Sequence, residues 1–421
     1  MQDLKNTFIG KDKFSYQWVF ENLLSEDEEF QKFLCFDGIP NKKTIIKASS
    51  FDLSDGKGCF SEVFRVTFEA NDGSSYNTIL KIPGSSHFND AINKSVLIDD
   101  NGNKFENNES MQKTLVQMHN RECEFYNMVK FTDCPLPKVL KAVHWEPSSN
   151  SYGCLLMRDL GIKAKMQSFS ESLTPGQVMN VVEIIAKLHA FTIKNIDRIK
   201  GYNMKFPYFS KDVDSIVDTQ IKKLKTKFPD MFGDLFERFL PFVSNEKFGK
   251  YVTVDCHTNF NIPALLSHGD IWTNNIYFKI DNNGCISNEV EALLDWQILN
   301  LGNPTIDIAR LLMISVNADI RHQYHDAIFD HYYNVLTKEL GDIPQLFLLE
   351  DFKKCYKFSQ LLQTYHTILM ISIFTNYIPK EDKNILAQKY KEEILMLRLK
   401  QAIEDGVRII ENDLKDFEYD F

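Results

Sequence analysis

One stretch of the sequence places a histidine, a glycine and an aspartate together, with an asparagine five residues beyond that aspartate. These residues are His268, Gly269, Asp270 and Asn275, and a second aspartate, Asp295, follows twenty residues after the asparagine. This order is typical of phosphoryl-transfer enzymes, in which one carboxylate receives the proton of the attacking hydroxyl while an amide oxygen and a second carboxylate bind Mg²⁺. The spacing therefore favours a fold that brings these side chains together.

The three oxygen-bearing side chains suit a magnesium-dependent reaction. Mg²⁺ prefers oxygen ligands and usually takes only one or two from the protein, with phosphates and water completing its shell. Asn275 would supply a neutral oxygen and Asp295 a charged one, which leaves Asp270 available as a general base, a role that contributes about 10²–10⁴ in rate. The alternative is that Asp270 and Asn275 are loop residues that make local turn hydrogen bonds, and the motif alone does not exclude it.

The residues that follow the motif predict a β-hairpin. Apolar segments at 276–280 and 290–294 have the length and composition of strands, and the turn sequence Asp-Asn-Asn-Gly lies between them at 281–284. A hairpin of this length would bring Asp270 and Asp295 close together in space. We interpret His268, Trp272, Trp296 and Asp307 as residues that pack or order the loop rather than as catalytic groups.

A second group of residues upstream has the features of a phosphate-binding turn. Gly56, Gly58 and Ser61 follow a Gly-x-Gly-x-x-Ser pattern that enters a strand rich in Val and Phe. Glycines let main-chain N–H groups approach phosphate oxygens. A strand rather than a helix follows, which argues against a Rossmann site, because that site needs a helix N-terminus for its pyrophosphate. Alone, the pattern is equally compatible with an ordinary hairpin turn.

Lys81 stands in an otherwise apolar strand predicted at residues 76–82. Such a lysine needs either an anionic partner or access to solvent. Glu122, on the inward face of a helix predicted over about residues 109–130, is its candidate partner, together with nucleotide phosphates. The alternative is an edge-strand lysine that reaches solvent and a solvated glutamate. The order of glycine turn, strand lysine, helix glutamate, Asp…Asn and Asp matches the kinase template in full.

Seven motifs together resemble one known family. They are Gly-x-Gly-x-x-Ser with Val-Phe-Arg-Val, Ile-Leu-Lys-Ile, Glu-x-x-Phe-Tyr, Leu-Leu-Met-Arg-Asp-Leu, Ala-Lys-Leu-His-Ala, His-Gly-Asp-x-Trp-x-x-Asn and Leu-Asp-Trp-Gln. They resemble the ecdysteroid kinase-like group, also called the CHK kinase-like domain, which is related to choline and aminoglycoside kinases. The resemblance runs from about residue 45 through the C-terminal part of the chain and is strongest to an uncharacterised invertebrate branch.

The resemblance implies an α+β, bilobal protein-kinase-like fold with a small β-rich N-lobe and a larger, mostly helical C-lobe. It implies that Asp270 is the base, that Asn275 and Asp295 bind the metal, and that Lys81 binds phosphate with Glu122 as its partner. Residues 155–160 would form the hinge that meets the adenine, which assigns Met157 and Asp159 to the nucleotide site. The hinge has Arg158 where relatives commonly carry an acidic residue. Because backbone groups bind adenine there, we expect Arg158 to tune binding rather than abolish it.

Several positions separate the chain from protein kinases. Gly269 stands where protein kinases have an arginine, the loop after Asp270 contains no lysine, and the metal motif is Asp-Trp-Gln. We therefore expect an ATP- and Mg²⁺-dependent kinase that transfers the γ-phosphate to a hydroxyl of a small, sterol-like or xenobiotic-derived substrate. A choline-like substrate stays open, since a quaternary ammonium needs only an aromatic cage. Segments 363–367 and 374–377 either line an apolar pocket or belong to the core. The alternative function is a catalytically inactive protein that binds nucleotide or lipid.

Length and composition complete the prediction. A chain of 421 residues with 43% hydrophobic residues can bury a large core, and we predict a helical appendage at 1–44, the N-lobe at 45–157 and the C-lobe at 158–421. The net charge of −10 argues against a nucleic-acid partner. The eight cysteines lack C-x-x-C spacing, and we see neither a secretory signal nor an apolar run that could span a bilayer. We therefore expect a cytoplasmic protein with reduced thiols.

Overall fold

The chain forms two compact units, which are described separately. Unit 1 contains the described residues up to 84 together with 109–128 and 137–163, and unit 2 contains 134–136 and the described residues from 164 onward. Gly56 and Gly58 lie outside the described residues. The computed structural model describes residues 4–10, 13–35, 43–53, 60–84, 109–128, 134–149, 151–202, 210–376 and 385–415.

Unit 1 is built on a five-stranded antiparallel sheet in the order β3-β4-β5-β7-β6. A hairpin joins β4 to β5, and Gly73 takes a φ of +81° in its turn, a backbone conformation that favours glycine. The sheet and its partner helix consist of β3 (Ile45–Asp52), β4 (Ser61–Ala70), β5 (Ser75–Pro83), α4 (Glu109–Met128), β6 (Val139–Val143), η1 (Pro147–Ser149) and β7 (Cys154–Arg158).

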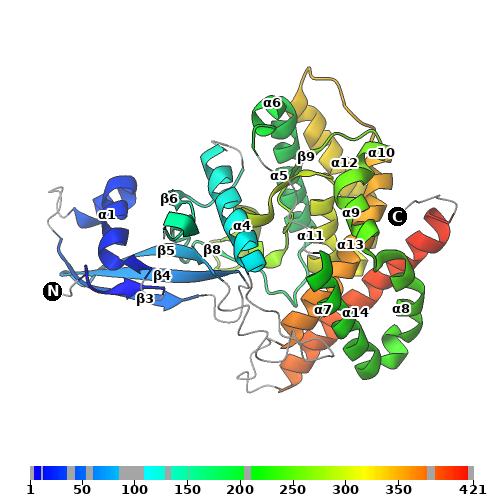
Figure 1. The fold of residues 1–421 in the computed structure, drawn as a ribbon, viewed down its shortest axis with the longest axis horizontal. Coiled ribbons are helices and arrows are strands. Elements are labelled where there is room, and N and C mark those ends of the chain that lie inside the picture. Colours follow the sequence, from blue (N-terminus) through cyan, green and yellow to red (C-terminus); the bar gives the residue numbers. More distant parts are fainter. Residues whose placement is uncertain are drawn as a thin grey trace. The chain divides into compact units, whose positions relative to one another are not determined.

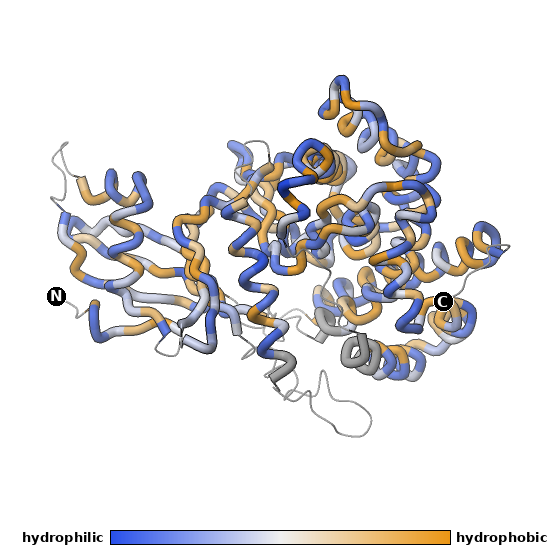
Figure 2. The backbone as a smooth tube through the Cα atoms, turned by 45° about the horizontal axis from the view of Figure 1, so that its top comes forward, coloured by the Kyte–Doolittle hydropathy of each residue, from blue (hydrophilic) through white to orange (hydrophobic). Residues whose placement is uncertain are grey.

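The two faces of this sheet contact different helices. Successive residues of a strand point to opposite faces, so Cys154 and Leu156 pack in the core with α1 and α2, whereas Leu155 and Met157 pack against Cys123 of α4. Figure 1 shows α1 lying over the sheet, and Figure 2 shows apolar and polar residues alternating along its strands. The N-terminal elements on the first face are β1 (Phe8–Ile9), β2 (Phe14–Ser15), α1 (Tyr16–Glu26) and α2 (Glu28–Leu34).

Unit 2 is mostly helical. Its first long helix, α5, begins with a capping box, in which Thr174 and Gln177 form reciprocal hydrogen bonds on either side of Pro175. The helices of this unit are α5 (Pro175–Lys194), α6 (Ile196–Ile199), α7 (Ser210–Lys227), α8 (Pro229–Val243), α9 (Glu246–Lys250), the π-helix η2 (Tyr251–Asp255), α10 (Cys256–Asn259), α11 (Ile306–Ser315), α12 (Ala318–Leu340), α13 (Leu349–Asn376), α14 (Ile385–Arg408) and the π-helix η5 (Ile409–Asp413).

Short strands between α10 and α11 hold the segment that contains Asp270. They form two small antiparallel sheets, one in the order β11-β10-β8 and one of β12 with β9. The predicted hairpin is present as β10 and β11, with Ile276 opposite Leu293. The elements are β8 (Ala164–Lys165), β9 (Leu265–Ser267), the 3-10 turn η3 (Thr273–Asn275), β10 (Ile276–Ile280), β11 (Ile286–Leu293), the 3-10 turn η4 (Trp296–Ile298) and β12 (Asn300–Gly302).

The architecture confirms the predicted fold class. The fold is α+β, with a small β-rich unit followed in the chain by a larger, mostly helical one. Every described strand pair is antiparallel. Within the described residues, the helices include none that is both long and apolar enough to cross a bilayer. In unit 2, Cys256 and Cys355 are free thiols whose sulfur atoms lie 3.7 Å apart in the core.

The core of unit 2 contains a histidine whose burial makes stability depend on pH. His189 on α5 is fully buried, its Nδ1 shares a hydrogen bond of 2.7 Å with the hydroxyl of Tyr332, and burial lowers its pKa from 6.5 to about 3. Between about pH 6.5 and pH 3, His189 therefore binds a proton in the unfolded chain but stays neutral in the folded chain. Stability should fall as the pH falls from about 6.5 toward 3 and should be unaffected by this group above pH 6.5.

We expect His189→Gln to reduce the slope of unfolding free energy against pH by up to about 1.4 kcal/mol per pH unit, the value for one proton. Urea unfolding between pH 6.5 and 4.5 measures the slope. His325→Gln is the matched control, since His325 is 46% exposed. An unchanged slope in His189→Gln would show that this histidine is protonated in the folded protein.

Candidate functional site

The loop that carries Asp270 connects β9 to η3 in unit 2, and its second residue is a glycine that no other residue can replace without strain. Gly269 takes a φ of +85°, and a Cβ atom built there would lie 2.8 Å from the carbonyl oxygen of Ile298. Real Cβ atoms do not approach backbone that closely, and the left-handed conformation disfavours side chains in any case. The glycine of the motif is therefore required by the path of the loop.

A buried carboxylate on α11 holds the start of this loop. Asp307 is fully buried, and its two oxygens accept backbone N–H groups of His268 and Gly269 at 2.7 and 2.8 Å. Burial raises the pKa of Asp307 to about 7, and the two backbone donors oppose that rise. The predicted ordering role of Asp307 is confirmed by these two hydrogen bonds.

His268 is a structural residue, as predicted. It is fully buried, and its Nε2 lies 2.9 Å from the carbonyl oxygen of Leu294. Its Nδ1 accepts the backbone N–H of Asp270 at 3.2 Å, so Nε2 carries the proton and donates. Its ring lies 4.3 Å from the ring of Trp296, and burial lowers its pKa. The neutral imidazole thus links the Asp270 loop to the end of the β10–β11 hairpin.

Asn275 is oriented by hydrogen bonds from its amide nitrogen. Nδ2 donates to the backbone oxygen of Asp270 at 2.9 Å and to Oδ2 of the same residue at 3.0 Å. Both partners are acceptors, so the nitrogen must face Asp270 and the amide oxygen must face away. In the described part of the chain no hydrogen bond reaches that oxygen. It is therefore available as a metal ligand.

Asp295 is brought beside this loop by the hairpin. The N–H of Leu294 donates to the backbone oxygen of Asn275 at 2.9 Å, which joins the two segments. Asp295 has φ 68° and ψ 59°, a left-handed conformation that is uncommon for a residue with a side chain and that is often found at functional sites. One of its carboxylate oxygens accepts a hydrogen bond from Gln297 at 3.3 Å.

Oxygen ligands from Asn275 and Asp295 fit a magnesium ion. Mg²⁺ typically takes one or two protein oxygens and completes its shell with phosphates and water. Among the residues that the structure describes, no three His, Cys, Asp or Glu side chains gather in a metal-binding group. Asn275 and Asp295 stay the predicted ligands.

A cation that the sequence analysis did not identify contacts the predicted base. Arg310 on α11 donates from Nε and Nη2 to Oδ1 of Asp270 at 3.0 and 2.6 Å, and from Nη1 to Gln363 of α13 at 3.3 Å. Its side chain is 10% exposed. Burial and the charge of Arg310 also lower the pKa of the neighbouring His366 to about 3. A signal was present in the sequence, because Arg310 lies one helical turn after Asp307 and so on the same face.

Unit 1 contains the predicted lysine–glutamate contact. Nζ of Lys81 lies 2.7 Å from a carboxylate oxygen of Glu122 on α4, and the two side chains are 10% and 2% exposed. β5 is an interior strand, since it pairs with β4 on one side and β7 on the other. The edge-strand alternative for Lys81 is therefore wrong. A buried ammonium–carboxylate pair is the arrangement that kinases use beside the α- and β-phosphates.

The other predicted nucleotide residues of unit 1 lie on the same sheet. The backbone oxygen of Met157 accepts a hydrogen bond from Thr78 at 2.7 Å. Asp159 follows β7 and accepts bonds from Nε of Arg65 at 2.7 Å and from the N–H of Gly161 at 2.9 Å. Ser61 is the first residue of β4 and pairs with Pro83. By strand alternation Lys81, Met157 and Arg65 share the face that contacts α4.

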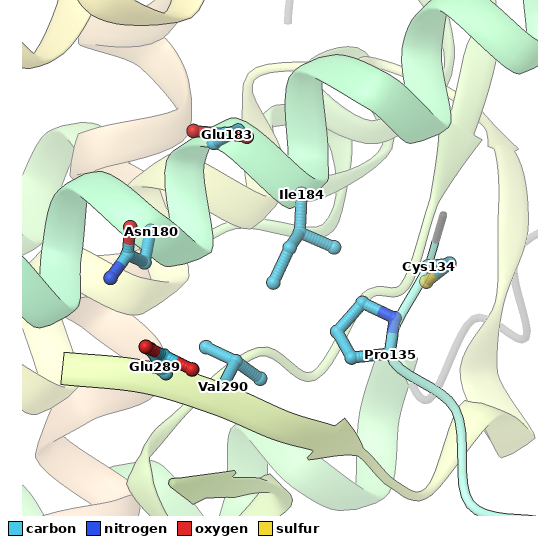
Figure 3. Close-up of a pocket in the computed structure, with 7 residues that line it drawn as sticks. All are labelled: Cys134, Pro135, Asn180, Glu183, Ile184, Glu289 and Val290. Atoms are coloured by element: carbon cyan, nitrogen blue, oxygen red, sulfur yellow. The ribbon is translucent and has the colours of Figure 1, made fainter. Parts of the chain in front are cut away.

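A cavity of about 350 Å³ also opens in unit 2 between α5 and β11 (Figure 3), but its polar groups are already paired. Glu183 contacts Lys187 at 2.8 Å, Glu289 contacts Lys279 at 2.9 Å, and Asn180 donates to a backbone oxygen at 2.7 Å. None of the predicted site residues is among those lining it, which are Cys134, Pro135, Asn180, Glu183, Ile184, Glu289 and Val290. We assign it no ligand.

Comparison with protein families gives one match that covers most of the chain. The model of the family described as "DUF1679: Uncharacterized oxidoreductase dhs-27" matches residues 42–414. A Caenorhabditis elegans protein described as "Uncharacterized oxidoreductase dhs-27" is 25% identical over 394 residues, which is 92% of this chain but 45% of that protein. The chain therefore spans less than half the length of this relative. The C. elegans "Uncharacterized kinase-like protein D1044.1" is 21% identical over 356 residues, 82% of this chain and 85% of that protein.

Solved structures with matches over most of the chain are phosphotransferases. Choline kinase from Cryptosporidium parvum is 9% identical, with a TM-score of 0.46, and the match covers 87% of this chain and 91% of that chain. The GDP complex of wild-type aminoglycoside 2'-phosphotransferase-IIIa is 10% identical, with a TM-score of 0.41, covering 92% of this chain and 98% of that chain.

The two hydrogen bonds of Asp307 predict the effect of removing one acceptor. In Asp307→Asn the amide offers one acceptor oxygen, and its NH₂ would face a buried backbone N–H. We expect the free energy of unfolding to fall by about 1–3 kcal/mol, the cost of one unsatisfied buried donor. Urea unfolding measures the change.

The matched control is Asp330→Asn, which makes the same substitution at an exposed position of α12. It should change the free energy of unfolding by no more than about 0.5 kcal/mol. Equal stability of Asp307→Asn and Asp330→Asn would mean that the loop does not depend on this carboxylate.

Proposed function

We propose that this chain, which belongs to the DUF1679 family and through it to the CHK-kinase-like proteins, transfers the γ-phosphate of ATP to a hydroxyl group of a small molecule. The observation that carries the proposal is the arrangement around Asp270. The loop carries the carboxylate of Asp270 and the amide of Asn275, whose oxygen faces away from that carboxylate. The hairpin that follows the loop leads to a second carboxylate, that of Asp295. These are the groups that phosphoryl transfer to an alcohol requires.

The hydrogen bonds of Asp270 indicate which of its oxygens accepts the proton. A carboxylate oxygen has two lone pairs. Oδ1 receives two donors from Arg310, whereas Oδ2 receives one donor from Asn275. Oδ2 therefore keeps a free lone pair and would accept the proton as the acceptor oxygen forms its bond to phosphorus and the bond to the nucleotide diphosphate breaks.

The remaining residues would bind and orient the nucleotide. Asn275 and Asp295 would hold Mg²⁺, and Lys81, kept in place by Glu122, would bind the phosphates. The metal, when bound, neutralises the charge that develops on the phosphate oxygens. Gly56, Gly58 and Ser61 would cover the phosphates, and the backbone near Met157 and Asp159 would meet the base.

The word oxidoreductase in the family description is not supported by the fold. A dinucleotide-dependent dehydrogenase of the Rossmann type needs a parallel sheet built from βαβ units. In the described residues every strand pair is antiparallel. The relative that carries this description has more than half of its length outside the match.

Arg310 and Asp270 form an ion pair, so their charges offset each other and select neither a cationic nor an uncharged acceptor. A choline-like acceptor carries a quaternary ammonium close to its hydroxyl, whereas a sterol-like or xenobiotic-derived alcohol carries none. We propose the sterol-like or xenobiotic-derived class of acceptor, with a choline-like alcohol as the alternative.

The direct test uses Asp270→Asn. We expect this variant to keep nucleotide affinity and to lose about 10²–10⁴ of the rate, because the base is gone while the binding groups stay. The assay is mass spectrometry of a small-molecule extract incubated with protein, ATP and Mg²⁺. A phosphorylated product that forms with the wild type and equally fast with Asp270→Asn would refute the assignment of the base.

The same assay distinguishes the catalytically inactive alternative. Binding of Mg²⁺ and ATP to the wild type, measured by calorimetry, without any phosphorylated product from extracts would favour a protein that only binds nucleotide. Absence of nucleotide binding would refute the proposed function itself.

Arg310 gives a second prediction for the same reaction. Arg310→Met should lower the rate of product formation by about 10²-fold, the cost of a base displaced by about 1 Å, and leave nucleotide affinity unchanged. Arg310→Lys keeps the positive charge but not the two-point contact with Asp270, so its rate of product formation should lie between those of Arg310→Met and the wild type. Arg238→Met, which removes an exposed arginine from α8, is the control. A raised KM with unchanged kcat in Arg310→Met would assign Arg310 to acceptor binding instead.

A further inference from the structure

The N-terminal helices of unit 1 contain a buried carboxylate that no part of the proposed reaction uses. Asp27 lies between α1 and α2, is fully buried, and accepts three hydrogen bonds. The donors are the hydroxyl of Tyr76 at 2.5 Å, Nη2 of Arg158 at 2.5 Å and the N–H of Glu29 at 3.2 Å. Burial alone would raise the pKa of Asp27, but the bonds from Tyr76 and Arg158 outweigh it and lower the pKa. The group is therefore an anion that depends on its partners.

Its main partner is the last residue of β7. The guanidinium of Arg158 reaches across to the helices and contacts both Asp27 and, at 2.7 Å, the carboxylate of Glu29. The backbone N–H of Arg158 donates to Lys138 at 2.9 Å, and Arg158 pairs with Thr78 of β5. The end of β7 is thus fixed from its backbone by the sheet and from its side chain by α2.

The next residue is held from the opposite face. Asp159 is 7% exposed and accepts Nε of Arg65 at 2.7 Å on the side of the sheet that also carries Lys81. Arg158 and Asp159, two consecutive residues of the segment 155–160, are therefore held by contacts on opposite faces of the sheet. This explains how Arg158 can replace an acidic residue here, because its side chain points to the helices and not to the face that would bind the nucleotide.

We propose that the Asp27–Arg158 contact is a brace, through which α1 and α2 set the backbone geometry of residues 155–160 and so the affinity for the nucleotide base. Asp27 and Arg158 are positioning residues. The inference rests on the proposed function, because it takes residues 155–160 as the segment that binds the base. Backbone groups that are held in their binding geometry before the ligand arrives lose less entropy on binding.

The brace makes a prediction about which ligands are affected. The base of a nucleotide would contact residues 155–160, whereas its phosphates would contact Lys81 and the metal site. Loosening the backbone at 155–160 should therefore weaken binding of a nucleotide but not of a phosphate chain alone. A variant that only lowers the stability of the fold would not separate the two ligands in this way.

Calorimetry with Mg²⁺–ADP and with Mg²⁺–tripolyphosphate tests this separation. We expect Asp27→Asn and Arg158→Gln each to raise the Kd for Mg²⁺–ADP by about fivefold or more, the lower end of typical coupling between sites. The Kd for Mg²⁺–tripolyphosphate should stay within about twofold of the wild type. The double variant should bind Mg²⁺–ADP no more weakly than Arg158→Gln alone, because Arg158→Gln already loses the contact with Asp27.

Hydrogen exchange without nucleotide gives an independent readout. Amides of residues 155–160 should exchange faster in Asp27→Asn and Arg158→Gln than in the wild type, because the contact that holds the strand end is lost. Arg238→Gln, which breaks an exposed ion pair with Glu411 in unit 2, is the matched control and should change neither exchange nor affinity. If Asp27→Asn does not fold, Tyr76→Phe removes one donor to Asp27 and keeps the packing of the ring.

The outcomes separate the brace from the proposed function. Wild-type binding of Mg²⁺–ADP with unchanged affinity and exchange in the variants would overturn the brace and leave the proposed function intact. An equal rise in the Kd for Mg²⁺–ADP and for Mg²⁺–tripolyphosphate would also overturn the brace, because the lost affinity would then not depend on contacts with the nucleotide base. A wild type that binds no nucleotide would overturn the proposed function, and with it the claim that the brace sets nucleotide affinity.

Discussion

The candidate site depends on one helix, α11, and on two charged residues that lie one turn apart on it. Asp307 accepts both backbone N–H groups at the start of the Asp270 loop, and Arg310 contacts the carboxylate of Asp270 within the same loop. The same element therefore sets the position and the orientation of the proposed base. Because both charges are buried, each would be costly alone, and each is compensated by the groups that it positions.

The residues proposed for phosphoryl transfer come from both units. Asp270, Asn275 and Asp295 belong to unit 2, and the Lys81–Glu122 pair belongs to unit 1, with Lys81 on an interior strand. In each unit, hydrogen bonds from other side chains hold the backbone near the proposed site, as His268 does at Leu294 and Thr78 does at Met157. Such support costs no reorganisation when ligands bind, which is how preorganised sites gain their rate.

The N-terminal helices α1 and α2 share a hydrophobic core with the sheet of unit 1. Their apolar residues, among them Val19, Leu23 and Phe30, bury one face of the sheet, and the anion of Asp27 ties them to the end of β7. An interior charge that is satisfied by both Tyr76 and Arg158 specifies one packing of helix on sheet, because any other packing would leave it unpaired. Through this contact the proposed brace would couple α1 and α2 to residues 155–160.

Local patterns in the sequence determined much of this protein. The hairpin after the motif, the capping box at Thr174 and the structural role of His268 follow from spacing, turn chemistry and hydrophobic periodicity, which act between near neighbours in the chain. Only the tertiary structure decided the partners of Arg158 and Arg310. A long guanidinium can reach several acceptors, and which carboxylate it finds, 131 or 40 residues away, depends on how distant elements pack.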